Sequence, residues 1–210
     1  NLGVSLSRQK GIVAAKYKLI AFLDSDDVWE PNKLAQQIDV LVNDPDCALC
    51  FTSSQFINEI GQRSEYILHA PAKVTYKDLL KQNVVSCSSV LVRREDLLET
   101  PMPDFPMIHE DYAVWLNLLQ KYPYARGIDK PLLTYQISST SKSGKKMKAA
   151  KMQWNTYRYC QLPFFKAGFS FFSYAFRNLK KYAEIKRQMK RQVNVAGKVN
   201  IKEQQAVLLE

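Results

Sequence analysis

Leu19-Ile20-Ala21-Phe22-Leu23-Asp24-Ser25-Asp26-Asp27 is the stretch that decides the fold class. Residues 19–23 form a continuous apolar run, which is typical of a strand buried on both faces of a parallel sheet. A helix is expected next, because Pro31 suits a first helical turn and apolar residues recur at helical spacing until Asn43-Asp44-Pro45. Strand-like and helical segments alternate up to residue 136, so the sequence predicts an α/β domain.

The other elements of this domain are predicted from apolar patterning and capping signals. Strands are expected over residues 48–52, 84–92, 124–128 and 132–136. Thr75 to Asp78 is a capping-box candidate for a short helix that ends at Gln82. Glu110 and Asp111 open a longer helix that ends before Pro123. Its expected core stripe is Tyr112, Trp115, Leu116 and Leu119.

Composition excludes several classes of protein. With 46% apolar and 24% charged residues, the chain is neither wholly disordered nor collagen-like. Four cysteines and two histidines leave little room for a metal cage of thiolates and imidazoles. Cys47 and Cys50 have zinc-pair spacing without a second pair, which favours a role in the core. The chain starts without a methionine and is interpreted as a fragment or a processed chain.

The formal net charge of +10 is concentrated in one segment. Residues 1–141 carry a net charge of −3, whereas residues 142–191 carry 14 Lys and Arg against one acidic residue. The small polar residues of 138–144 are typical of a linker. We therefore expect two parts, a front domain over residues 1–141 and a basic amphipathic helical tail over residues 142–210, with the tail working at an anionic surface.

Asp24 and Asp26 are the first candidates for a functional site. They stand two apart at the end of the predicted strand, and a period of two places their side chains on the same side. Carboxylate oxygens suit Mg²⁺ or Mn²⁺, and such an ion leaves positions for the oxygens of a diphosphate. Open α/β folds also bind ligands at this edge of the sheet. The alternative is a short acidic turn that only caps the next helix.

Four blocks of the front domain resemble family 2 glycosyltransferases. The blocks are Asn1-Leu2-Gly3-Val4-Ser5-Leu6-Ser7-Arg8, Gly11-Ile12-Val13-Ala14-Ala15, Ile20 to Leu34 and Glu110-Asp111-Tyr112-Ala113-Val114-Trp115-Leu116. The resemblance implies a GT-A nucleotide-diphospho-sugar transferase fold, inverting chemistry and a divalent metal. It also implies a partial fold with its first strands missing, so that residues 1–141 are a catalytic domain without its N-terminal nucleotide-binding portion, followed by a C-terminal helical extension.

The same resemblance implies a role for each acidic residue. Asp26 matches the metal-binding acid of the Asp-x-Asp motif, and Asp24 matches its partner near the metal, ribose and diphosphate. Arg8 matches an arginine close to the nucleotide. Asp111 matches the catalytic base, with Glu110 beside it near the acceptor. Without the family, Glu110 and Asp111 are better explained as acids that stabilise the first turn of a helix.

Departures from the family pattern are few. Gln9, Lys16 and Asn117 stand where Asn, Gly and Arg are usual, and none of them removes a carboxylate. The larger departure is the missing front portion. It leaves the strand of residues 19–23 as an uncovered apolar edge, so we expect the 210-residue chain alone to be poorly soluble and inactive.

The tail combines aromatic and basic residues. Its aromatic residues are Phe164, Phe165, Phe169, Phe171, Phe172, Tyr174 and Phe176. Its flanking basic residues are Lys166, Arg177, Lys180, Lys181, Lys186, Arg187, Lys190 and Arg191. The apolar part is shorter than the roughly 20 residues of a spanning helix and suits an interfacial helix on anionic lipid. The alternative is a helical pair packed on the front domain with a solvated basic face.

Taken together, the residues and the resemblance predict a metal-dependent inverting glycosyltransferase that uses Mn²⁺ or Mg²⁺. It would move a sugar from a nucleotide-diphospho-sugar donor to a glycan or lipid-linked acceptor in cell-surface polysaccharide synthesis. We expect it to be cytoplasmic and peripheral at the inner face of the cell membrane. The alternative is a non-catalytic remnant whose basic tail binds anionic membrane or nucleic acid in a salt-sensitive way. The joint presence of Asp26 and Asp111 favours the enzyme, and nucleic acid is not expected as its partner.

Overall fold

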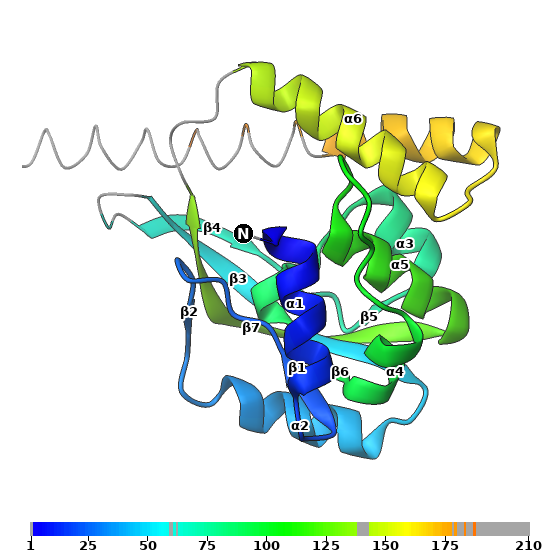
Figure 1. The fold of residues 1–210 in the computed structure, drawn as a ribbon. Helices are drawn as coiled ribbons and strands as arrows, with labels where there is room; N and C mark the ends of the chain where they lie inside the picture. Colours follow the sequence, from blue (N-terminus) through cyan, green and yellow to red (C-terminus); the bar gives the residue numbers. More distant parts are fainter. Residues whose placement is uncertain are drawn as a thin grey trace, which may run out of the picture.

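A computed structural model describes residues 2–58, 61, 63–137, 143–177, 179, 183 and 187. Figure 1 shows a mixed sheet in the middle of the molecule, with helices packed on both of its faces. The helices are α1 (Gly3–Ala14), α2 (Lys33–Asn43), α3 (Tyr76–Lys81), α4 (Arg94–Glu99), α5 (Glu110–Lys121) and α6 (Ser143–Tyr159). A short 3-10 turn covers Cys87–Ser89, and residues 164–177 form a further helix.

The sheet is mixed. Its strands are β1 (Leu19–Ala21), β2 (Val28–Trp29), β3 (Cys47–Asn58), β4 (Arg63–Leu68), β5 (Lys73–Val74), β6 (Leu91–Arg93) and β7 (Tyr124–Ile137). The order is β1-β6-β3-β7-β2, with β4 paired to β3 and β5 paired to β7. Of the pairings among these strands, only β3 with β7 is parallel. The predicted α/β class is confirmed.

The first strand lies at an edge of the sheet, as the missing front portion predicts, but the interpretation of a strand buried on both faces of a parallel sheet is wrong. β1 ends at Ala21, pairs antiparallel with β6 alone and lies at the end of the sheet, so it is an edge strand among the described residues. All three of its residues are half-buried. Phe22 leaves the strand and packs edge-on against Trp115 of α5, with ring centroids 6.1 Å apart. The apolar run therefore serves one buried face and one helix contact, not two faces of a central strand.

Two other strand predictions also differ from the structure. Residues 84–92 contain the turn Cys87–Ser89 before β6, because Ser86 accepts hydrogen bonds at its carbonyl from both the N–H (2.9 Å) and the hydroxyl (2.7 Å) of Ser89. The two strands expected between residues 124 and 136 are one strand, β7, whose pairing with β3 shifts register beside Pro131.

The helical predictions agree with the structure more closely. Thr75 caps α3 in a capping box with Asp78, as its spacing predicts. The core stripe of α5 is buried at Tyr112, Trp115, Leu116 and Leu119. Cys47 and Cys50 are buried free thiols, which agrees with a role in the core.

Residues after 143 contribute to the same core as the sheet and α5. Tyr157, Leu162 and Ala167 belong to the main hydrophobic cluster, and the Tyr157 hydroxyl donates to the carbonyl of Leu80 at 2.7 Å. The linker expected at residues 138–144 lies mostly outside the described residues. Within the described parts of the chain, no helix is both long and apolar enough to cross a bilayer.

Candidate active site

Arg8 joins two acidic segments that are far apart in the sequence. Its guanidinium reaches from α1 to both of them: Nη2 lies 2.6 Å from Asp24 Oδ1, and Nη1 lies 2.9 Å from Glu110 Oε1. The Arg8 side chain is 15% exposed, so both ion pairs are partly shielded from water and salt. The predicted Asp-x-Asp segment and the predicted Glu-Asp segment therefore meet in one site.

The segment from Asp24 to Asp27 is a turn. The N–H of Asp27 donates to the carbonyl of Asp24 at 3.1 Å, and the N–H of Asp24 donates to Ser88 Oγ at 3.0 Å. The argument that strand alternation places Asp24 and Asp26 on one side is thus wrong, because β1 has already ended. The turn, anchored on Ser88, is what sets the direction of these carboxylates.

Asp26 and Asp27 have different surroundings. Asp26 is exposed, and within the described residues its carboxylate has no hydrogen bond or ion pair. Asp27 is buried: Oδ1 accepts the N–H of Gln136 at 3.4 Å, and Oδ2 has no partner among the described residues. Burial is the main cause that raises the pKa of Asp27, with repulsion from Asp26 and Asp24 adding to it.

These carboxylates are compatible with a hard divalent cation. Asp26 has an open carboxylate, and Asp24 keeps its Oδ2 outside the ion pair that its Oδ1 makes with Arg8. Both predicted ligands therefore offer oxygen donors, which Mg²⁺ and Mn²⁺ prefer. Within the described part of the chain, no three or more His, Cys, Asp or Glu side chains gather around one point. The protein would therefore provide one or two ligands, with waters and substrate phosphates completing the shell.

Asp111 lies in the first turn of α5, beside Glu110. Its Oδ1 accepts the N–H of Tyr112 at 2.7 Å. Burial raises the pKa of Asp111 and repulsion from Glu110 raises it further, while Arg8 and His109 oppose these effects. A carboxylate with a raised pKa is a stronger base and suits proton abstraction.

Two helices hold the segment that leads into Glu110. From α1, the Ser5 hydroxyl donates to the carbonyl of Pro103 at 2.5 Å, and Gln9 Oε1 accepts the N–H of Met102 at 2.9 Å. From α6, Asn155 donates to the carbonyl of Met107 at 3.1 Å.

α6 also supports the N-cap of α5. Thr156 Oγ1 accepts the N–H of His109 at 2.9 Å. Met107 has a φ of +62°, in the left-handed region that non-glycine residues rarely adopt. The hydrogen bonds from α1 and α6 therefore hold in place a strained segment that leads to Glu110 and Asp111.

Comparison with known proteins identifies the family. Over 182 residues the chain is 36% identical to "Putative teichuronic acid biosynthesis glycosyltransferase TuaG" of Bacillus subtilis (strain 168), an alignment covering 86% of this chain and 71% of that protein. The sequence model of glycosyl transferase family 2 matches residues 1–99. The chain belongs to this family.

A second curated relative and a solved structure agree with this. The chain is 33% identical over 156 residues to the Escherichia coli protein "UDP-Glc:alpha-D-GlcNAc-diphosphoundecaprenol beta-1,3-glucosyltransferase WfgD", covering 73% of this chain and 59% of that one. The structure of S. aureus TarS residues 1–349 in complex with UDP-GlcNAc superposes with a TM-score of 0.52 at 14% identity, over 73% of this chain and 46% of that one. This likeness shows that the fold is of the GT-A type, as predicted.

Sequence reasoning missed a group of residues that supports the turn from Asp24 to Asp27. Trp29 Nε1 donates to the carbonyl of Ser88 at 2.7 Å, and the Lys33 ammonium lies 4.2 Å from the centroid of the Trp29 ring. Gln37 accepts from Lys33 Nζ at 2.7 Å and donates to the carbonyls of Cys50 and Ser89. Small polar residues at 86–89, which interrupt an apolar pattern, were the signal that a turn and not a strand lies here.

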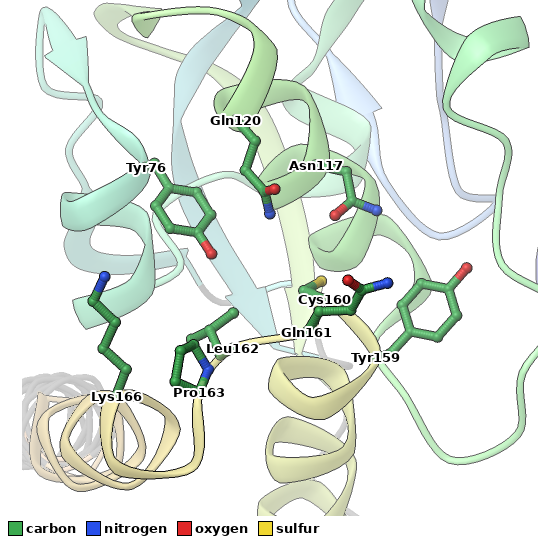
Figure 2. Close-up of a pocket in the computed structure, with 9 residues that line it drawn as sticks. All are labelled: Tyr76, Asn117, Gln120, Tyr159, Cys160, Gln161, Leu162, Pro163 and Lys166. Carbon is green, nitrogen blue, oxygen red and sulfur yellow. The ribbon is translucent and has the colours of Figure 1, made fainter.

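A separate cavity lies away from the acidic residues. It measures about 560 Å³ and is found between α3, α5 and the turn that follows α6 (Figure 2). Its polar lining includes Tyr76, Asn117, Gln120, Gln161 and Lys166. None of the predicted catalytic, nucleotide or metal residues borders it.

Proposed function

We propose that this family 2 protein is an inverting glycosyltransferase that transfers a sugar from a nucleotide-diphospho-sugar donor to a glycan or lipid-linked acceptor. One observation supports this above the others. The Arg8 guanidinium ion-pairs with Asp24 and Glu110 at once, so donor-side and acceptor-side acids stand on either side of one cation.

Asp111 serves as the general base in this proposal. The acceptor hydroxyl gives its proton to an Asp111 carboxylate oxygen while the hydroxyl oxygen bonds to the anomeric carbon. The bond from that carbon to the diphosphate oxygen breaks on the opposite face, and the diphosphate leaves with the electron pair. A single displacement of this kind inverts the anomeric centre. General-base assistance of this type contributes roughly 10² to 10⁴-fold in rate.

Arg8, Glu110 and Asp24 position the reacting groups. Arg8 keeps a positive charge beside the donor, since a guanidinium stays protonated, and it fixes the Glu110 carboxylate near the acceptor. Asp24 holds Arg8 from the donor side. Asp26 and Asp24 would hold Mn²⁺ or Mg²⁺, which supplies Lewis-acid stabilisation of the departing diphosphate.

The relatives support a uridine diphosphate sugar as donor and a lipid-linked saccharide as acceptor. WfgD is named for UDP-Glc and for a diphosphoundecaprenol-linked acceptor, TarS was solved with UDP-GlcNAc, and TuaG is named for teichuronic acid biosynthesis. Lipid-linked acceptors lie in a membrane, so we place the enzyme on the cytoplasmic side, peripheral to the inner face of the cell membrane and working in cell-surface polysaccharide synthesis. Residues 1–141 form the catalytic domain and residues 142–210 the basic attachment region.

The test is sugar transfer by the full-length product of the native gene with UDP-, GDP- and dTDP-sugars, with and without Mn²⁺. We expect transfer from a UDP-sugar with an inverted anomeric configuration by NMR, and strong loss of metal-dependent activity in Asp26→Ala. Asp46→Ala, an aspartate that no proposed step uses, is the matched control and should keep full activity. A folded protein that turns over no donor while its tail binds lipid or nucleic acid would replace this proposal with the non-catalytic alternative.

A further inference from the structure

The helix of residues 164–177 presents a row of phenylalanines to solvent. Phe165, Phe169, Phe172 and Phe176 are between 72% and 90% exposed, and Leu179 continues the row at 64%. Large apolar side chains are exposed singly on most proteins, but a contiguous row of this kind marks an interaction surface. We call these five residues the phenylalanine face.

The spacing of the phenylalanine face is helical. The residues stand 4, 3, 4 and 3 positions apart, and at 3.6 residues per turn they fall within an arc of about 80°. Ala167 and Ser170, on the other side of the same helix, are buried. Phe171 is half-buried and contacts Trp154 of α6 with ring centroids 6.0 Å apart. The helix is therefore fixed to the body by one side, and the phenylalanine face points outward.

Positive charges border this face. Lys166 and Arg177 lie roughly 100° from it around the helix, between the phenylalanines and the body. Lys166 is exposed and also lines the cavity together with Tyr76 (Figure 2). In the sequence, residues 142–191 carry a net charge of +13. Aromatic side chains directed outward with cations beside them match an anionic bilayer, where the rings insert and the cations meet headgroup phosphates.

We propose that the phenylalanine face is a membrane-inserting surface that binds bilayers containing anionic lipid. This deepens the proposed function, since it names the part of the chain that holds the enzyme at the membrane and separates these residues from the aromatics that belong to the core. A second copy of this chain is a poorer occupant, because pairing two faces would bring two strongly cationic segments together.

Co-sedimentation of the full-length protein with lipid vesicles tests the inference. The protein is expected to bind vesicles of phosphatidylcholine mixed with phosphatidylglycerol more tightly than vesicles of phosphatidylcholine alone. The double variant Phe169→Ser/Phe172→Ser should bind the mixed vesicles at least about tenfold more weakly, because two exposed rings no longer leave water. Lys166→Gln/Arg177→Gln should lose the preference for anionic lipid and much of the salt sensitivity.

The matched control is Ile38→Ser/Val42→Ser, which removes two exposed apolar side chains on α2. It should bind vesicles like the parent protein, and all variants should keep the parent's circular dichroism and melting temperature. Unchanged vesicle binding by Phe169→Ser/Phe172→Ser would overturn the inference. Two other results would also overturn it. One is a parent protein that binds no vesicles but forms a dimer, with Phe169→Ser/Phe172→Ser monomeric. The other is displacement of the protein from vesicles by an oligonucleotide.

Vesicle binding and catalysis fail separately. Binding is measured without donor or metal, so Asp111→Asn should bind vesicles normally even if transfer is lost. Transfer to a short-chain soluble acceptor by a protein that binds no vesicles would refute only the membrane-binding inference. Vesicle binding by a protein that transfers sugar to no acceptor would refute only the proposed function.

Discussion

Lys33 is a buried cation that has no carboxylate partner among the described residues. Its side chain is fully buried, held by Gln37 at 2.7 Å and by the face of Trp29. Burial lowers its pKa to about 8 from the ordinary value of 10.5. Unfolding therefore takes up a proton between these two pH values, and the native state gains stability as the pH rises through this window.

Lys33→Met removes this titration. Below pH 8 the wild type bears the full cost of a charged Lys33, about 3 kcal/mol for the shift in pKa, and this cost disappears toward pH 10.5. The stability of the wild type relative to Lys33→Met should therefore rise between pH 8 and pH 10. Urea unfolding of both proteins across this range measures it. Parallel pH curves would show that Lys33 is not the cause.

Arg8 has a double effect on Asp111 and its neighbours. Arg8→Gln breaks the link between Asp24 and Glu110, and we expect the transfer rate to fall about 10²-fold through misplaced reacting groups. Arg8 also opposes the raised pKa of Asp111, so its loss should move the acidic limb of the kcat/KM profile to higher pH. A uniform drop in rate with an unmoved limb would restrict Arg8 to donor binding.

At the scale of elements, β7 depends on a close backbone approach at Gly127. A Cβ atom there would lie 2.2 Å from the carbonyl oxygen of Pro71 and 2.9 Å from that of Ala70. Gly127→Ala should lower the free energy of unfolding by about 1–3 kcal/mol, because neither backbone contact can move aside cheaply. Gly11→Ala on α1 meets nothing within 4 Å and should stabilise the protein slightly. Equal effects in thermal melts would contradict this packing.

The hydrogen bond from α6 that supports the segment before α5 leads to a separate prediction. Thr156→Val deletes the oxygen that accepts the N–H of His109, whereas Thr156→Ser keeps it. We expect the valine variant to lose about tenfold in kcat, since the acidic pair loses its support, and the serine variant to stay near the wild type. Steady-state kinetics on both decides it, and equal loss in the two would assign the effect to packing of the threonine methyl group.

The sequence predicted features that depend on local patterns better than features that depend on contacts between distant residues. The α5 stripe of Tyr112, Trp115 and Leu116 and the capping box at Thr75 are local patterns, and the structure has both. The run of residues 19–23 could not reveal its neighbours, because an apolar strand fits an edge with one helix contact as well as a sheet centre. Similarly, nothing in the sequence spacing shows that α6 supports His109 across 47 residues.

At the candidate site, the resemblance supplied residues and the structure supplied their relation. Arg8, Asp24 and Glu110 were predicted separately, and their joint ion pairs depend on how α1, β1 and α5 pack. The support from Ser88, Trp29 and Lys33 was missed, because each is an ordinary residue in the sequence and acquires its role only through burial.

At the scale of the whole molecule, α1, β1 and the residues that flank them expose several large apolar side chains. They are Leu2, Val4, Val13, Tyr17 and Leu23. β1 is also at one edge of the sheet among the described residues. We expect the 210-residue chain to self-associate in solution. Analytical ultracentrifugation over a range of concentrations tests it, and a chain that stays monomeric throughout would contradict it.

The role of Asp111 is the central claim, and comparing Asp111→Asn with the wild type in single-turnover transfer and in UDP binding is its most direct test. The amide keeps the size of the side chain but cannot take the acceptor proton. We predict a loss of roughly 10² to 10⁴-fold in the transfer step with UDP affinity unchanged. Transfer within a few-fold of the wild type, in a folded protein that binds UDP normally, would contradict the assignment of Asp111 as the base.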